Sequence, residues 1–218
     1  ARFSRPVRRT FRVPAPRDDP AGFVRALLEI VRAERIDLLV PTCEELFYVA
    51  RGRAALAAEC AVLAEPLERL RSLHNKWLFA QRAERYGLAV PQTWLLQSQA
   101  DLRAALAHCP GVVLKPVYSR FAARTLLPPH KAHALALVQP SAAQPWVAQA
   151  FVHGRQVCTC SLAHAGRLAA HTAYPADFTA GQGATIVFRH IEHPAARAWV
   201  EAFVAREGFS GQIAFDFI

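Results

Sequence analysis

The chain has 218 residues, of which 53% are hydrophobic, and its formal net charge at pH 7 is +9. This length and hydrophobic content allow one large or two small domains with a real core, and they exclude a disordered chain. No apolar run approaches the roughly 18 residues of a membrane span, so we expect no membrane partner. The positive charge is nearly all arginine and is spread over the chain, which does not favour a nucleic-acid partner.

The five cysteines are scattered and include no CxxC pair, which predicts free thiols and a cytoplasmic protein. Cys158 and Cys160 lie two residues apart in a predicted strand and therefore share a face. Two small buried hydrophobic side chains explain them better than a metal pair does. The chain contains no methionine and stops inside an apparent strand, IAFDFI. We therefore expect a fragment of a longer protein, truncated at both ends.

The first part of the chain alternates helical and strand patterns. Residues 22–34 carry apolar side chains at helical spacing, with Arg and Glu on the other face. The apolar runs IDLLVP and AVLAEP are typical of buried parallel strands, and a helical segment with a weak point at Gly52 lies between them. We therefore expect residues 1–72 to form part of a Rossmann-like α/β domain with a parallel sheet.

Residues 73–218 change to a mostly antiparallel α+β pattern, because strands dominate after about residue 146. The helix start and stop signals and the apolar runs predict helices at 75–86, 99–108, 129–138 and 194–207. They predict strands at 93–96, 112–116, 124–127, 146–151, 155–164, 167–174, 186–191 and 212–218. Ala165-Gly166 is expected to form a hairpin turn.

Lysine is rare in this chain, which contains only Lys76, Lys115 and Lys131 beside many arginines. Lys76 lies at the start of a predicted helix, where a cation is unfavourable unless an anion is also present. Lys115 ends the apolar strand VVLKP, where partial burial of an ammonium group is costly without an anion. The pair predicts a phosphate site. For Lys76 the alternative is an ordinary solvated lysine.

Four segments occur in an order that resembles the ATP-grasp superfamily: NKWLFAQRAERYGLAVPQTW, VVLKPVYSR, WVAQAFVHGRQ and GFSGQIAFDFI. The preceding IDLLVPTCEELFYVA resembles the α/β pre-grasp domain of these carboxylate–amine and carboxylate–thiol ligases and carbamoyl-phosphate-synthase-like proteins. The resemblance covers residues 20–218. It implies a partial pre-grasp domain over 1–72 and an α+β ATP-grasp domain over 73–218. That domain would have a lid at about 90–146 and an antiparallel core at about 147–218, incomplete at its C-terminus.

The resemblance also implies the residues of an ATP site. The positions that match ATP contacts are Lys76, Lys115, Ser119, Arg120, Gln149, Ala150, Phe151, Val152 and Gln156. Asp216 matches one of the residues that hold Mg²⁺. The chain departs from the family pattern in two places. The segment at 118–124 has no glycine where the family has a glycine-rich loop, and Gln156 stands near the position of a ribose-binding carboxylate.

The activity implied is ATP-dependent ligation. A small-molecule carboxylate would form an acyl phosphate with ATP and Mg²⁺, and an amine or a thiol would then displace the phosphate. The second Mg²⁺ carboxylate of the family would lie beyond Ile218, so we expect this fragment to be inactive even if its parent is an enzyme. The glycine-free loop leaves a second hypothesis open, which is a catalytically inactive, ATP-grasp-like nucleotide-binding or regulatory module. The sequence predicts no oligomeric state.

Other polar residues have two explanations each. Glu44 and Glu45 follow a predicted strand end, where they would face a substrate, or they are first-turn acids that complement a helix dipole. The loop at 174–183 either contacts the acceptor or is an ordinary surface loop. Two histidine pairs at i, i+3 spacing are interpreted as surface residues and not as metal ligands: His130 with His133, and His190 with His193.

Overall fold

The computed structural model describes residues 5–119, 124–180 and 184–218. The chain divides into two compact units, Ala1–Leu70 with Ser210–Gln212, and Arg71–Phe209 with Ile213–Ile218. None of the helices in the described ranges is both long and apolar enough to cross a membrane.

The first unit is a small α/β arrangement. Its elements are α1 (Pro20–Glu34), β1 (Leu38–Leu39), α2 (Leu46–Arg51), α3 (Arg53–Ala57) and β2 (Ala61–Val62). The strands β1 and β2 pair in parallel, as predicted, but each is only two residues long, and the predicted burial is wrong because Leu38 is 50% exposed. The predicted break at Gly52 separates α2 from α3. Phe23, Val49, Leu56 and Ala64 form the buried core.

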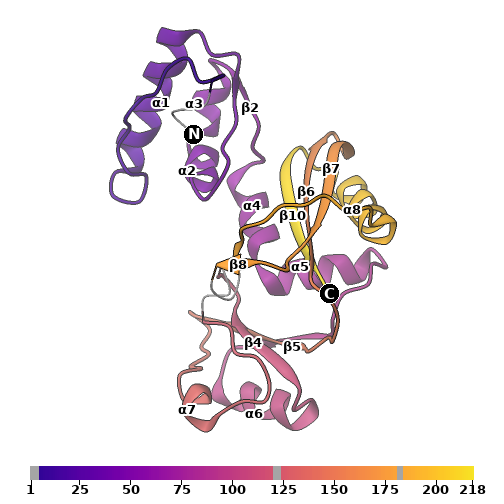
Figure 1. The fold of residues 1–218 in the computed structure, drawn as a ribbon. Helices are drawn as coiled ribbons and strands as arrows, with labels where there is room; N and C mark the ends of the chain where they lie inside the picture. Colours follow the sequence, from indigo (N-terminus) through magenta and orange to yellow (C-terminus); the bar gives the residue numbers. More distant parts are fainter. Residues whose placement is uncertain (1–4, 120–123, 181–183) are drawn as a thin grey trace. The chain divides into compact units, whose positions relative to one another are not determined.

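The second unit contains a three-stranded antiparallel sheet in the order β3–β5–β4. The strands β4 and β5 are labelled in Figure 1. Its elements are β3 (Thr93–Leu96), α6 (Gln99–His108), β4 (Val112–Pro116), α7 (Ala132–Leu135) and β5 (Trp146–Ala150). One face of the sheet packs on α6 through a buried cluster that includes Leu96, Leu102, Leu114, Trp146 and Ala148. Because side chains alternate along a strand, Lys115 lies on the opposite face.

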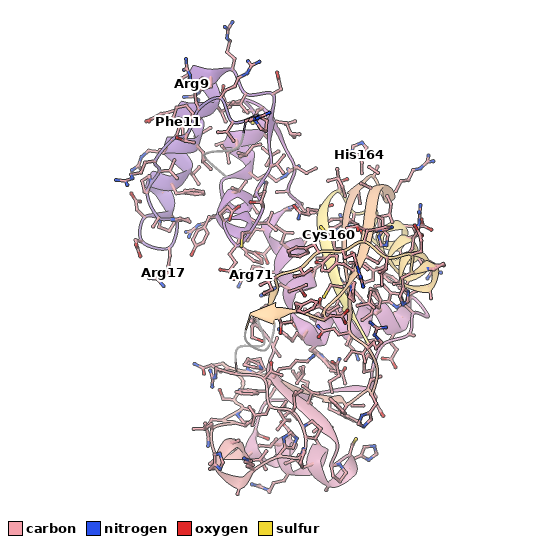
Figure 2. The ribbon with its side chains drawn as sticks, viewed as in Figure 1. Arg9, Phe11, Arg17, Arg71, Cys160 and His164 are labelled. Carbon is pink, nitrogen blue, oxygen red and sulfur yellow. The ribbon has the colours of Figure 1, made fainter. Side chains whose placement is uncertain are left out.

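The second unit also contains the sheet β10–β6–β7, except for Gly211 and Gln212 of β10, which belong to the first unit. Its elements are α5 (Lys76–Arg85), β6 (Val157–His164), β7 (Arg167–Pro175), α8 (Pro194–Glu207) and β10 (Gly211–Phe217). His164, labelled in Figure 2, lies at the end of β6, where Ala165 and Gly166 form the expected turn with φ of 47° and 78°. The core beneath this sheet includes Val200, Val204 and Phe209. The remaining elements are α4 (Leu67–His74), β8 (Thr179–Ala180) and β9 (Ala184–Thr185).

Three predicted elements differ from the structure. Helix α7 is much shorter than the expected 129–138, and Leu126 forms only an isolated bridge to Leu114. Pro128 and Pro129 lack backbone N–H groups, so they donate to neither a helix nor a sheet. The expected strand 186–191 is wrong, because within the described ranges only Ile191 bridges to β7 there. The side chain of His190 instead bonds to Thr172 Oγ1 at 3.0 Å.

Candidate functional site

Lys76 is the first residue of α5, and local capping explains the position. The side chain of Asn75 accepts a hydrogen bond from the N–H of Leu78 at 3.0 Å, which satisfies one of the free donors of the helix start. The Nζ of Lys76 donates to the carbonyl oxygen of Ser119 at 2.8 Å and to that of Val117 at 3.4 Å. The start of α5 is therefore tied to the segment that follows β4.

The pKa of Lys76 is lowered to about 8, first by burial and second by the positive charge of Lys115. In the described part of the chain, the hydrogen bonds of its Nζ go to carbonyl oxygens and to no carboxylate. Carbonyl oxygens solvate an ammonium group but do not neutralise its charge. An anion bound here would relieve the cost of burying this cation.

Lys115 lies on β4, and its Nζ donates to Gln149 Oε1 on β5 at 2.8 Å. Burial lowers the pKa of Lys115, and the charge of the Asp216 carboxylate on β10 opposes that effect. The charge of Lys115 in turn lowers the pKa of Lys76. The structure therefore brings two partly buried ammonium groups close enough to repel each other, which is the electrostatic character of an anion site.

Phe151, Val152 and Gln156, three of the positions that match ATP contacts, line a pocket of about 460 Å³, whereas Gln149 and Ala150 do not. Its walls are formed by Thr125, Leu127, Phe151, Val152, His153, Gly154, Gln156 and Ile218. The N–H groups of Ala150 and Phe151 are used elsewhere, because they donate to the carbonyl oxygens of Gln92 and Gly111 at 2.9 Å each. The backbone that borders the pocket is therefore Val152–Gly154. A Cβ on Gly154 would lie 2.9 Å from Ile218 Cγ2, so a side chain there would displace the end of the chain.

Asp216 lies on the exposed face of β10. Burial, and then a hydrogen bond to the Asp216 carboxylate, raises the pKa of Cys158 to about 12, so this thiol is inert. Asp216 and Lys76 both line a second pocket of about 310 Å³, whose other walls are mostly apolar and include Phe79 and Phe215. Among the described residues, no group of three His, Cys, Asp or Glu side chains is arranged to hold a metal ion.

Two further predicted residues lie in other surroundings. Glu45 belongs to the first unit, and its carboxylate accepts from the backbone N–H of Thr42 at 2.7 Å and of Cys43 at 2.9 Å. Burial alone would raise the pKa of Glu45, but these backbone donors lower it. Glu45 precedes α2, which has no acidic residue in its first turn, and its carboxylate bonds to the backbone before the helix, so the expected role as a first-turn acid is not what the structure shows. Glu44 lies beside it in the same unit, and its substrate role stays a prediction.

Arg120 falls outside the described residues, as does part of the 174–183 loop. His193 accepts a hydrogen bond from the Ala196 N–H at 3.1 Å and so caps α8. The five cysteines are free thiols.

The sequence did not single out Thr93, whose hydroxyl accepts a hydrogen bond from Gln149 Nε2 at 2.9 Å. Thr93 and Gln149 are cross-strand partners, although 55 residues separate them along the chain. Only the pairing of β3 with β5 reveals this contact. His153 was also missed as a residue that lines the pocket, although it directly follows Val152, which was predicted to contact ATP.

No family model and no curated protein sequence matches the chain. Solved structures do resemble it. An L-amino acid ligase from Bacillus licheniformis has 16% identity and a TM-score of 0.62, with 92% of this chain and 52% of that chain covered. The biotin carboxylase domain of Hydrogenobacter thermophilus 2-oxoglutarate carboxylase, in complex with MgADP, ADP and bicarbonate, has 7% identity and a TM-score of 0.69, with 91% and 49% covered.

An N5-carboxyaminoimidazole ribonucleotide synthetase in complex with ADP has 17% identity and a TM-score of 0.63, with 93% of this chain and 53% of that chain covered. The chain thus spans about half the length of each of these three proteins. All three are ATP-grasp proteins. The likeness extends over both units of the chain, and it agrees with the order of the four segments in the sequence. The chain therefore has the fold of the ATP-grasp superfamily.

Proposed function

We propose that the chain binds ATP, with the phosphates at Lys76 and Lys115 and the adenine in the pocket bordered by Val152–Gly154. The observation that carries the proposal is the pair of partly buried ammonium groups, whose burial and mutual repulsion lower the pKa of Lys76 to about 8. A polyphosphate would compensate both charges. The pocket of about 460 Å³ is within the range of small-molecule sites, and the rings of Phe151 and His153 contact each other in its wall.

In this proposal each side chain has a separate task. Lys115 is held by Gln149 on the β3–β5–β4 sheet, and Lys76 is held at the start of α5. The two cations therefore approach the phosphates from different elements. Catalysis of phosphoryl transfer depends mainly on positioning and on neutralisation of charge, and two fixed lysines supply both.

We further propose that the protein uses bound ATP to activate a small carboxylate for attack by an amine or a thiol. The names of the neighbours support this: an amino acid ligase, a biotin carboxylase domain and a ribonucleotide synthetase. The second candidate is a nucleotide-binding or regulatory module without catalysis. It is supported by the sequence, which has no glycine at 118–124 and has Gln156 near the position of a ribose-binding carboxylate.

A magnesium ion prefers several oxygen ligands in octahedral geometry. Asp216 offers one carboxylate, and no group of three His, Cys, Asp or Glu side chains among the described residues is arranged to hold a metal ion. The described residues therefore do not fit a magnesium site of their own. The proposal is for the nucleotide, and any magnesium would have to rely on phosphate oxygens for most of its ligands.

Calorimetric titration of the chain with ATP, with and without Mg²⁺, tests the binding proposal. We expect one site for ATP, and weaker binding of adenosine, because adenosine lacks the groups that neutralise the lysines. If neither ATP nor MgATP binds, the proposal is wrong. Release of phosphate from ATP by the full-length parent protein, in the presence of mixed amino acids, would support a ligase, whereas the module predicts no release by the parent either.

Binding of ATP should take up protons near pH 8. Free Lys76 has a pKa of about 8, and a bound phosphate raises it, so the complex holds a proton that the free chain has partly lost. At pH 8 the uptake should be about half a proton per ATP, and affinity should fall several-fold from about pH 7 to about pH 9. Calorimetry in buffers of different ionisation enthalpy measures this uptake.

The matched control is Lys76→Arg, which keeps the charge but does not titrate in this range. Its ATP affinity should lose the Lys76 part of the pH dependence. The same pKa has a consequence for folding: between pH 8 and about pH 10.5 the unfolded chain binds more protons at Lys76, so stability should rise with pH there. A pH-independent affinity in the wild-type chain would contradict the assignment.

A further inference from the structure

Three side chains on one face of the β3–β5–β4 sheet form a continuous hydrogen-bonded chain that ends at Lys115. Thr93 Oγ1 donates to the carbonyl oxygen of Pro91 at 2.8 Å. Gln149 Nε2 donates to Thr93 Oγ1 at 2.9 Å, and Lys115 Nζ donates to Gln149 Oε1 at 2.8 Å. The Pro91 carbonyl thus orients Thr93, Thr93 orients Gln149, and Gln149 orients Lys115.

The strand register explains why these residues meet. On β5, Gln149 is the direct partner of Thr93 on β3 and of Val113 on β4. Lys115 lies two residues beyond Val113 and therefore on the same face, within diagonal reach of Gln149. The opposite face of the same strands forms the apolar core with α6, which includes Leu114, Trp146 and Ala148. The polar chain is consequently fixed by a well-packed sheet.

The direction of every bond in the chain is determined. The Pro91 carbonyl can only accept, so the hydroxyl hydrogen of Thr93 points to it and leaves the Thr93 oxygen as an acceptor. The amide nitrogen of Gln149 must then face Thr93, because the amide oxygen cannot donate. The amide oxygen of Gln149 therefore faces Lys115. A charged ammonium group has donors and no acceptor, so Lys115 must donate to this oxygen. Thr93 thus sets the orientation of Gln149.

The acceptor held at Lys115 is neutral, and this matters for charge. A glutamate of the same shape would accept the same hydrogen bond but would also neutralise the ammonium group. Two charged groups among the described residues interact electrostatically with Lys115. One is Lys76 at the start of α5, whose pKa is lowered by Lys115, and the other is Asp216 on β10. Among the described residues, no ion pair with an N–O distance of 4 Å or less joins Asp216 to Lys115. Gln149 on β5 adds no charge.

We propose that Gln149 and Thr93 are positioning residues that aim Lys115 while leaving its full positive charge available to a ligand phosphate. The proposal rests on the proposed ATP site and gives the glutamine a role of its own. It predicts that a stronger hydrogen-bond acceptor at position 149 weakens the binding of a phosphate at Lys115. Gln149→Glu should weaken ATP binding about tenfold, because its carboxylate competes with the phosphate for Lys115. Affinity for adenosine should be unchanged, because adenosine carries no phosphate.

The test has a second readout that does not depend on nucleotide binding. The chain has only three lysines, so a sample labelled with ¹³C at lysine Cε gives three lysine signals, assigned by Lys→Arg variants. A pH titration then reports the pKa of Lys115 directly. It should rise in Gln149→Glu, which adds a negative charge, and fall in Gln149→Met, which removes the acceptor. A merely structural role for Gln149 predicts no such opposite shifts.

Thr93 supplies a matched pair of variants. Thr93→Val keeps the shape but removes the acceptor that orients Gln149, so the pKa of Lys115 should fall and ATP binding should weaken about threefold. Thr93→Ser keeps the hydroxyl group and should resemble the wild-type chain in both readouts. Thermal unfolding checks that each variant is folded. If Gln149→Glu does not fold, Gln149→Met and Thr93→Val still test the proposal.

The outcomes of the two readouts are distinguishable. If the wild-type chain does not bind ATP, the proposed function fails, and the Lys115 titrations still decide whether the chain of hydrogen bonds controls this lysine. If ATP binds and Gln149→Glu binds it as tightly as the wild-type chain, the proposal is overturned. An unchanged pKa of Lys115 in Gln149→Glu and Gln149→Met would overturn it as well.

Discussion

Lys115→Met should weaken ATP binding about 100-fold. The ammonium group of Lys115 is largely buried and is held on a rigid sheet by Gln149, so its loss leaves a phosphate beside a neutral side chain. Truncation of one partner of a desolvated charge pair costs about 2–5 kcal/mol, and about 2.7 kcal/mol corresponds to a factor of 100. Calorimetry with ATP, on the variant and on the wild-type chain, measures the change.

The control is Lys131→Met, which removes an exposed lysine at the start of α7. It changes the net charge of the chain equally and should leave the ATP affinity within about twofold. Methionine matches the length of lysine, so Lys115→Met should fold, and relief of a buried charge should leave its free energy of unfolding at neutral pH unchanged or higher. A folded Lys115→Met variant with wild-type affinity would contradict the site assignment.

The largest effect on stability is expected from Phe203→Ala. Phe203 on α8 is fully buried, and its ring lies 5.4 Å from Phe79 on α5, 5.4 Å from Trp199 and 5.3 Å from Phe215 on β10, measured between centroids. Loss of a buried phenylalanine costs about 3–5 kcal/mol through lost transfer energy and a cavity. We therefore expect the free energy of unfolding to fall by about 3–5 kcal/mol in urea titrations.

Phe178→Ala is the matched control, because Phe178 is 61% exposed and the same atoms are removed. Its free energy of unfolding should change by less than about 0.5 kcal/mol. Phe203 also joins α5 to α8 and β10, which together position Lys76, so the Phe203→Ala variant should bind ATP less well where it is still folded. A cost below about 1 kcal/mol would mean that this cluster does not hold the core together.

The sequence predicted the elements that carry local signals. Helices α6 and α8 have the predicted bounds, because α6 begins after the capping Ser98 and α8 begins at Pro194 and is closed by Gly208 in a left-handed conformation. Strand β3 has the predicted bounds. Among the three predicted elements that differ, 186–191 has an apolar start, but Ile186 and Phe188 are 60% and 67% exposed, so an apolar run alone did not indicate burial.

The two lysines of the candidate site could be predicted because each stands where a cation is locally unfavourable. Thr93 could not, since nothing local marks a threonine at the start of a strand as special. Its role depends on the register that places it opposite Gln149, which is a property of the folded sheet. The pocket proposed for adenine was only partly predictable for the same reason: Phe151 and Gln156 lie close together in the sequence, whereas Leu127 and Ile218 come from distant segments.

The most direct test of ATP binding at these lysines is a titration of the ¹³Cε-lysine-labelled chain with ATP, followed by NMR. The chain supplies its own internal control, because Lys131 is exposed and Lys76 and Lys115 are not. We expect the Lys76 and Lys115 signals to move with ATP, the pKa of Lys76 to rise from about 8, and Lys131 to stay unchanged. If Lys76 and Lys115 do not respond, or respond no more than Lys131, the two lysines do not form a phosphate site.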